Sequence, residues 1–538
     1  MLHTQKTTEK VVLIGMDGAT FDIILPLVRE GKLPNFAKLL EEGTWGNTTA
    51  IPPYSPPMWT SIITGVKPEK HGMYDFGYLK DDKFIPFSIS CIKSTPLWRI
   101  LSNRNREVGV FDWLFAWPPE KINGFMVTLN YRGMSPFSMA YPKDITLSYS
   151  LPSIDGSKIN FTSDEQYIEF VTSIEKYKEN LFLKLKENYN ADFLAYVSYL
   201  PDDLQHFYYS YMEPYYFDVR EEEVKKYGNT IVEGYKLLDD FLGNFIDNEN
   251  ITLIIVSDHG FHRSDITAGP ILVRNFQPFG RYKHIVFRMN YFLYKIGFLS
   301  FDEERGEEIN FSQTRAYFCN NLTLSGICII SRDRQEKIKI AKEISEILTN
   351  TKLENGEKIF LNVSITNNPN DGPDLIFKIN PILLEKENFE IECNNTVFYK
   401  PLSIKHIIYK DAKIGKIVIS NNSFGVNELI DFTQLPGNHQ INGIIIMKGK
   451  NIKKNFTIQK IYPIDIAPTI LYLLKEKIPT YMEGKVLTEA INEEYLVKNP
   501  VVYIEEKEIS PNIIVPEIWK GEEFEAIKER LKELGYLK

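Results

Sequence analysis

Three largely apolar runs, at residues 11–16, 193–199 and 251–256, in which only Ser198 and Thr252 are polar, constrain the fold of this chain more than any other feature. A strand that is apolar at every position is typical of a parallel sheet that is buried on both faces. Helical patterns lie between the runs, notably over residues 164–189 and 220–245. This alternation predicts an α/β fold with a mainly parallel central sheet.

Potential metal ligands directly follow each of these runs. Asp17 follows the first, Asp202 and His206 follow the second, and Asp258 and His259 follow the third. In open α/β sheets the carboxyl ends of the strands form the edge where ligands bind. Mixed carboxylates and imidazoles suit zinc or manganese, whereas calcium prefers oxygen ligands only. Taken singly, each residue is more often a helix cap or part of an ordinary turn than a metal ligand.

A second candidate site begins at Ser55, which two prolines follow at once. Residues 58–64 have a helical pattern that Gly65 can end. Serine is a favoured N-cap and proline suits the first helical positions, so Ser55 is predicted to cap this helix. Its hydroxyl and the helix's free N–H groups would then lie near the same phosphate. The simpler alternative is that Ser55 is a cap and nothing more.

Composition excludes several kinds of partner. The 538-residue chain has a net charge of −9 with no basic stripe, so neither a nucleic-acid polymer nor an anionic membrane is expected as a partner. The four cysteines are scattered, which argues against a disulfide framework and favours a reducing compartment. The N-terminus runs straight into a strand without a signal peptide, and no apolar run approaches the roughly 18–20 residues of a membrane span. A cytoplasmic protein is expected, with no indication of its oligomeric state.

The chain beyond residue 262 departs from the regular alternation. We expect a catalytic domain over residues 1–385 and 435–538, with a lid over residues 262–310 that contains an aromatic-rich helix at 285–299. Short alternating runs over residues 386–434 indicate a small β-rich insertion. His439 lies just before a further strand, at 443–447.

Several of these stretches form an ordered set: Ile14-Gly15-Met16-Asp17-Gly18, Ser55-Pro56-Pro57, residues 202–206, Ser257-Asp258-His259-Gly260 and Gly437-Asn438-His439. The set resembles the alkaline phosphatase superfamily, in particular its type I phosphodiesterase/nucleotide pyrophosphatase-like branch and the predicted phosphohydrolases and phosphomutases within it. The resemblance spans residues 11–487, including closing motifs at 465–471 and 482–487. It implies a three-layer αβα sandwich with a mainly parallel central sheet.

The resemblance also implies a role for each residue of the set. One divalent metal would be held by Asp17, Asp258 and His259, with the Ser55 hydroxyl as its reacting ligand. The second would be held by Asp202, His206 and His439. Both ions would be zinc, with manganese as the alternative.

The implied reaction is hydrolysis of a small-molecule phosphate monoester or diester through a phosphoserine at Ser55, with helix N–H groups stabilising the charge that develops. A phosphomutase and a non-catalytic phosphate-binding protein are the alternatives. No residue is assigned to substrate binding.

Three positions qualify the resemblance. Asp75 stands where nucleotide pyrophosphatases of this branch carry an asparagine that contacts a phosphoryl oxygen. Trp59 stands where a sulfatase would need arginine, which excludes that activity. His71 lies in a matching loop, and we expect it to shape that loop without binding metal.

Overall fold

The computed structural model describes the following residues of the chain. They are 9–80, 83–129, 139–149, 151, 161–214, 220–263, 267–268, 284–287, 289–301, 310, 313–319, 325–331, 333–353, 358–365, 374–379, 391–393, 396–398, 416–419, 422–425, 430–433 and 437–509.

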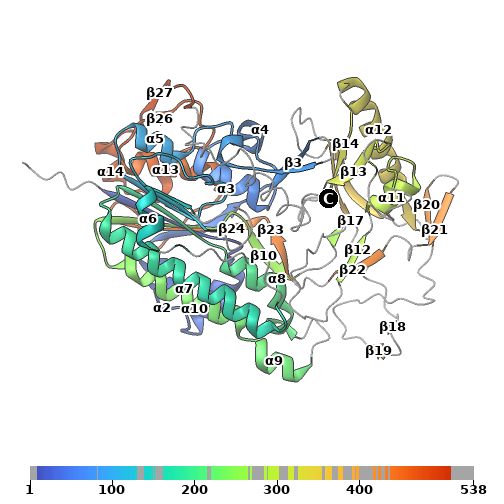
Figure 1. Ribbon diagram of the computed structural model, residues 1–538, viewed down its shortest axis with the longest axis horizontal. Helices are drawn as coiled ribbons and strands as arrows, with labels where there is room; N and C mark the ends of the chain where they lie inside the picture. Colours follow the sequence, from blue (N-terminus) through green and yellow to red (C-terminus); the bar gives the residue numbers. More distant parts are fainter. Residues whose placement is uncertain are drawn as a thin grey trace, which may run out of the picture.

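One nine-stranded sheet forms the centre of the molecule, in the order β25-β2-β24-β9-β1-β8-β5-β6-β7 (Figure 1). Its strands are β1 (Lys10–Met16), β2 (Thr44–Thr49), β5 (Val108–Phe111), β6 (Gly124–Thr128), β7 (Met139–Tyr141), β8 (Phe193–Ser198), β9 (Ile251–Val256), β24 (Asn442–Lys448) and β25 (Phe456–Thr457). The five strands from β9 to β6 in this order are mutually parallel, while β24 runs antiparallel to β9 and β7 to β6. The predicted mainly parallel sheet is confirmed.

The three apolar runs are the adjacent strands β9, β1 and β8 at the middle of this sheet. Every residue of β8 and β9 is buried. Their apolar side chains can be continuous because helices cover both faces of the sheet.

Helices form a layer on each side of the sheet, as Figure 1 shows. On one side lie α2 (Pro34–Glu42), α7 (Asp164–Asn188) and α10 (Thr230–Ile246), and on the other lie α3 (Ser55–Thr64), α5 (Leu97–Asn103) and α13 (Ile466–Leu473). Further helices are α1 (Phe21–Arg29), α4 (Pro68–His71), α6 (Lys143–Ser148), α8 (Leu200–Met212), α9 (Glu221–Tyr227) and α14 (Glu493–Lys498). The three-layer αβα sandwich is confirmed.

Two local predictions are corrected by the structure. The single helix expected over residues 220–245 is divided into α9, which ends at Tyr227 with Gly228 as its C-cap, and α10; an added Cβ at Gly228 would lie 2.6 Å from the Val224 carbonyl oxygen. Strand β2 was not predicted, because its sequence, Thr-Trp-Gly-Asn-Thr-Thr, has little apolar content. It nevertheless pairs along its full length with β24.

A second hydrophobic core lies outside the central sheet. It is built by the four-stranded sheet β13-β14-β17-β16 and two helices, and residues such as Phe292, Ile344 and Phe377 are buried in it. The elements are α11 (Met289–Lys295), β13 (Ala316–Cys319), β14 (Ser325–Ile329), α12 (Arg334–Asn350), β16 (Phe360–Ile365) and β17 (Leu375–Ile379). They lie to the right of the sandwich in Figure 1.

The segments predicted as lid and insertion are described only in part. Residues 285–299 were expected to form one helix, but β12 (His284–Phe287) precedes the short helix α11. Strand β12 pairs with β22 (Ile430–Thr433), which belongs to the predicted insertion. Other described strands there are β18 (Ile391–Cys393), β19 (Thr396–Phe398), β20 (Lys416–Ile419) and β21 (Asn422–Gly425). The rest of both segments lies outside the described residues, and their boundaries stay a prediction.

Two findings bear on the environment of the protein. No described helix is both long enough and apolar enough to cross a membrane. Cys328, in β14, is disulfide-bonded, whereas Cys91 is a free thiol. The bonded Cys328 differs from the expectation of a reducing compartment, in which cysteines remain thiols.

Candidate metal centre

The carboxyl ends of three neighbouring strands bring the predicted aspartates together. Asp17 directly follows β1, Asp258 lies two residues beyond β9, and Asp202 lies in the first turn of α8, which follows β8. Strand β1 lies between the other two, with Gly15 in register with both Val256 and Val197. The three carboxylates therefore meet at one edge of the sheet, as the parallel topology requires.

Ser55 and His439 reach the same edge from the other half of the sheet. Strand β2 runs antiparallel to β24, so its carboxyl end meets the amino end of β24. Ser55 follows β2, and His439 lies in β23 (Gly437–Gln440), just before β24. Strand β23 pairs with β10 (Gly260–Arg263), with His439 opposite Phe261. Because β24 runs in the opposite direction to β9, His439, which precedes β24, lies at the same edge of the sheet as the aspartates that follow β1, β8 and β9.

Ser55, Asp17, Asp258 and His259 form the first half of the site. The Ser55 hydroxyl oxygen lies 3.4 Å from Asp17 Oδ1 and 3.2 Å from His259 Nε2. His259 Nε2 also lies 3.4 Å from Asp17 Oδ1 and 3.3 Å from Asp258 Oδ2. All four side chains are buried. Their ligand atoms are thus close enough to share one ion.

The predicted role of Ser55 as a helix cap is wrong. The N-cap of α3 is Tyr54, and Ser55 is the first helical residue. Prolines 56 and 57 have no N–H to donate, and the Met58 N–H bonds the Tyr54 carbonyl at 3.2 Å. The Ser55 hydroxyl therefore faces Asp17 and His259. For the same reason, the first turn of α3 offers a bound anion few amide donors besides that of Ser55.

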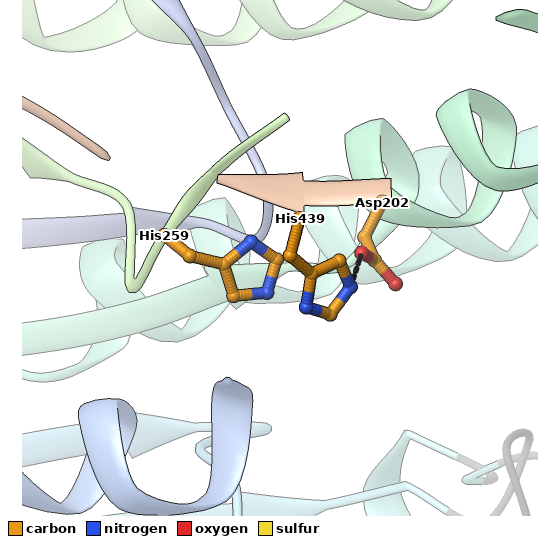
Figure 2. Close-up of side chains that lie close together, drawn as sticks. All are labelled: Asp202, His259 and His439. Carbon is orange, nitrogen blue, oxygen red and sulfur yellow. Dashed lines mark ion pairs between the residues drawn. The ribbon is translucent and has the colours of Figure 1, made fainter. Parts of the chain in front are cut away.

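Asp202, His206 and His439 form the second half. Asp202 Oδ1 lies 3.3 Å from His206 Nε2 and 3.2 Å from His439 Nε2, and the two Nε2 atoms are 3.0 Å apart. The rings of His439 and His259 are stacked with centroids 3.6 Å apart. Figure 2 shows His439 between His259 and Asp202. The two halves are therefore in direct contact.

Each of the three histidines turns its Nδ1 toward a backbone carbonyl. The contacts are His206 with Gly437 at 3.2 Å, His259 with Gly260 at 3.0 Å, and His439 with Pro53 at 3.1 Å. A carbonyl only accepts, so Nδ1 must carry the proton and Nε2 presents a lone pair. This is the usual arrangement of histidines that bind metal through Nε2.

The electrostatics of the site favour an added cation. Burial and the nearby Asp202 carboxylate raise the pKa of Asp258 to about 7. Burial, together with His439, holds the pKa of His259 well below its usual range. The Asp258 Oδ2 atom is buried without a hydrogen bond among the described residues. The Nε2 atoms of His206 and His439 also face each other at 3.0 Å, and despite burial the Asp202 carboxylate raises the pKa of His206, so this cluster favours a positive charge. A cation among these atoms would relieve each unfavourable contact.

A comparison with protein-family models identifies the chain. Residues 11–316 match the model for type I phosphodiesterase/nucleotide pyrophosphatase. The chain belongs to this family. Membership supports phosphoester hydrolysis as the activity and a small-molecule phosphoester as the substrate. No curated protein sequence matches the chain.

Solved structures of family members align with most of the chain at low similarity. Human ectonucleotide pyrophosphatase/phosphodiesterase 5 is 14% identical, with a TM-score of 0.45, and the alignment covers 90% of this chain and 100% of that one. The murine form is 14% identical, with a TM-score of 0.44 and the same coverage. An inactive murine form in complex with AMP is 14% identical over 87% of this chain and 96% of that one, with a TM-score of 0.42.

The two family-motif residues outside the metal centre have distinct contacts. His71 is buried, its Nδ1 accepts the Met73 N–H at 3.1 Å, and its Nε2 lies 3.1 Å from the Pro57 carbonyl in α3. It shapes the loop against the first turn of α3. Asp75 accepts the Tyr54 hydroxyl at 2.9 Å and the Phe76 N–H at 2.7 Å.

Sequence reasoning missed two buried residues that support the ligands. Trp59 donates its indole N–H to Asp17 Oδ2 at 3.1 Å. Gln205 donates to the Gly18 carbonyl at 2.9 Å and accepts from the Tyr235 hydroxyl at 3.1 Å, which ties α8 to the turn after Asp17. Nothing in the sequence pattern distinguishes either residue from ordinary core, since their partners lie far away in the chain.

Proposed function

We propose that this protein is a two-metal phosphohydrolase in which Ser55 is the nucleophile. The observation that carries the proposal is the position of the Ser55 hydroxyl, which lies 3.4 Å from Asp17 Oδ1 and 3.2 Å from His259 Nε2 in a buried cluster of carboxylates and imidazoles. A serine held only for helix capping would instead bond the amides of its own helix.

The residues present fit two divalent ions. Asp17, Asp258 and His259, with the Ser55 hydroxyl, would hold the first, and Asp202, His206 and His439 would hold the second. The buried, unbonded Asp258 Oδ2 and the converging Nε2 atoms support this assignment. Mixed nitrogen and oxygen donors suit zinc, and manganese accepts the same set.

When bound, the ions would supply positive charge that lowers the pKa of a hydroxyl or water and neutralises phosphoryl oxygens. Ser55 loses its hydroxyl proton to solvent and attacks phosphorus, so that its Oγ–P bond forms as the bond to the leaving oxygen breaks and that oxygen takes up a proton. Water then attacks the same phosphorus, and the Oγ–P bond breaks to restore the hydroxyl. Two prolines remove amide donors from the first turn of α3, so the helix backbone contributes less charge stabilisation than the sequence predicted.

The proposed substrate is a small phosphate ester. The net charge of −9 provides no general attraction for a polyanion, so the binding of phosphate must be local to the ions. Asp75 is held by Tyr54, the residue next to Ser55. A carboxylate there repels a monoester dianion more than a diester monoanion, which favours a diester substrate.

Two features of the chain bear on its cellular location. A cytoplasmic protein was expected from the scattered cysteines and the polar N-terminus. The disulfide at Cys328 argues the other way, since such bonds persist mainly in oxidising compartments.

The decisive experiment combines metal analysis with two chromogenic substrates. Wild-type protein should contain two divalent ions per chain and hydrolyse bis-p-nitrophenyl phosphate faster than p-nitrophenyl phosphate. Ser55→Ala should keep the fold and lose at least about a thousandfold in turnover. Undiminished turnover in Ser55→Ala would overturn the nucleophile assignment.

Hydrolysis in ¹⁸O-labelled water separates the alternatives. The proposed hydrolase incorporates one solvent oxygen into the released phosphate or phosphate monoester. A phosphomutase would return the phosphoryl group to its substrate without solvent oxygen. A non-catalytic binding protein would bind phosphate and turn over neither substrate.

A further inference from the structure

We propose that Trp59 is a positioning residue for the first metal, orienting Asp17 so that one oxygen of its carboxylate is presented to the ion. This inference rests on the proposed function, because it assumes that Asp17 is a ligand. Trp59 takes no part in the bond-making and bond-breaking steps of the proposed reaction.

The hydrogen bonds of Asp17 distinguish its two oxygens. The indole N–H of Trp59 donates to Oδ2 at 3.1 Å. Oδ1 instead lies 3.4 Å from both the Ser55 hydroxyl oxygen and His259 Nε2. The oxygen that faces the other ligand atoms is therefore not the oxygen that Trp59 binds. A carboxylate fixed in this way favours coordination through Oδ1 alone.

The indole itself is held rigidly in place. Trp59 is fully buried, and its ring lies against Gly15 of β1, where an added Cβ would be 2.6 Å from Cη2 and 2.7 Å from Cζ3. On another side Trp113 packs edge-on, with ring centroids 5.1 Å apart at an angle of 81°. Gly15 thus allows a close approach that no other residue would permit. Gly15 therefore leaves the space that Trp59 needs to reach Asp17.

Trp59 also couples the nucleophile to the ligand. It lies four residues after Ser55 on α3, and residues with this spacing lie on the same helix face. A single helix therefore presents the hydroxyl at its first residue and fixes the carboxylate of Asp17 one turn later. A partner of this kind, which orients a ligand without touching the ion, typically changes metal affinity by about 10–100-fold when removed.

A purely structural role is the competing explanation, and Trp113 offers a matched control. Trp113 is a buried tryptophan in the same ring pair, but its indole nitrogen makes no hydrogen bond among the described residues. Trp59→Phe and Trp113→Phe remove similar packing. Only Trp59→Phe removes the hydrogen bond to Asp17.

The test is titration of metal-free protein with Zn²⁺ in competition with a chromophoric chelator. Wild type should show two binding events. Trp59→Phe should weaken one of them by about 10–100-fold and leave the other unchanged, while Trp113→Phe should leave both unchanged. The thermal midpoints of the two metal-free variants should fall by similar amounts.

Gly15→Ala provides a second route if Trp59→Phe fails to fold. It keeps the indole but displaces it, and it should weaken the same single binding event. Equal effects of Trp59→Phe and Trp113→Phe, or an unchanged first event in Trp59→Phe, would overturn the inference.

Asp17→Asn separates this inference from the proposed function. If wild type binds no Zn²⁺, or if Asp17→Asn keeps both events, the proposed two-metal site fails. If Asp17→Asn loses one event while Trp59→Phe loses none, only the role of Trp59 fails.

Discussion

The two halves of the metal centre are built in different ways. The first half takes its residues from the ends of β1 and β9 and from α3, and its two carboxylates are 3% exposed or less. The second half takes them from α8 and from β23, a short strand outside the central sheet, and His206 is 13% exposed. The two halves therefore differ mainly at His206, which is partly exposed, while Asp202 and His439 are buried like the residues of the first half.

This difference suggests a division of labour. In the proposed reaction the first half would fix Ser55 as the nucleophile, for which small displacements are costly. The second half contains the partly exposed His206, and in the proposed reaction it would serve the step in which water cleaves the phosphoserine.

Removing one ligand from each half should stop the reaction at different steps. Asp258→Ala should prevent attack by Ser55, while His439→Ala should permit attack but slow the water step. Both should lower turnover by at least about a hundredfold. Only His439→Ala should accumulate a phosphoryl adduct on Ser55, which intact-protein mass spectrometry after reaction with bis-p-nitrophenyl phosphate would detect. The same adduct level in both variants would contradict the division.

Gly437→Ala should disturb the second half alone. An added Cβ would lie 2.3 Å from the Gln205 carbonyl oxygen, and the Gly437 carbonyl orients His206. We expect one of two Zn²⁺ affinities to fall by about tenfold while the other is unchanged. Gly243→Ala on α10 is the control, since its Cβ would meet only the flexible Asn35 side chain at 3.3 Å. Weakening of both affinities by Gly437→Ala would show that the halves are not independent.

Asp75→Asn should improve the binding of anionic substrates near the first half. Removing one negative charge should raise kcat/KM for p-nitrophenyl phosphate by about fivefold to tenfold, and less for the diester. Steady-state kinetics with both substrates measures the ratio. Tyr54→Phe keeps the negative charge of Asp75 and removes only the hydroxyl that bonds it, so this variant should not raise kcat/KM. A loss of activity in Asp75→Asn would instead indicate that the carboxylate binds a cationic group.

His71, which packs against the first turn of α3, should make the stability of the fold sensitive to acid. Burial lowers the pKa of His71 from 6.5 to about 3. Between these values the unfolded chain binds a proton that the folded chain does not, so stability falls as the pH falls. The contribution of His71 to this slope is up to about 1.4 kcal/mol per pH unit.

His71→Asn should be less stable than wild type at pH 7 but lose less stability between pH 6.5 and pH 4. Chemical denaturation at several pH values measures both quantities. Parallel pH profiles for the two proteins would exclude His71 as a source of the slope.

The sequence by itself determined the central strands and the site residues that follow them. Apolar runs predicted β1, β8 and β9, and the rule that carboxyl ends of parallel strands share one edge placed Asp17, Asp202 and Asp258 together. These predictions succeed because a doubly buried strand needs apolar side chains at every position, and this signal is local. The polar strand β2 carries no such signal, and it was missed.

Only the tertiary structure decided how the ligands are held. The position of His439 depends on the reversed direction of β24, and the contact of Trp59 with Asp17 depends on the space left by Gly15. Both are contacts between segments that are distant in the chain, so no local pattern encodes them. The N-cap of α3 is likewise Tyr54 and not Ser55. The two prolines after Ser55 have no N–H for its hydroxyl to accept, and the hydroxyl lies instead beside Asp17 and His259.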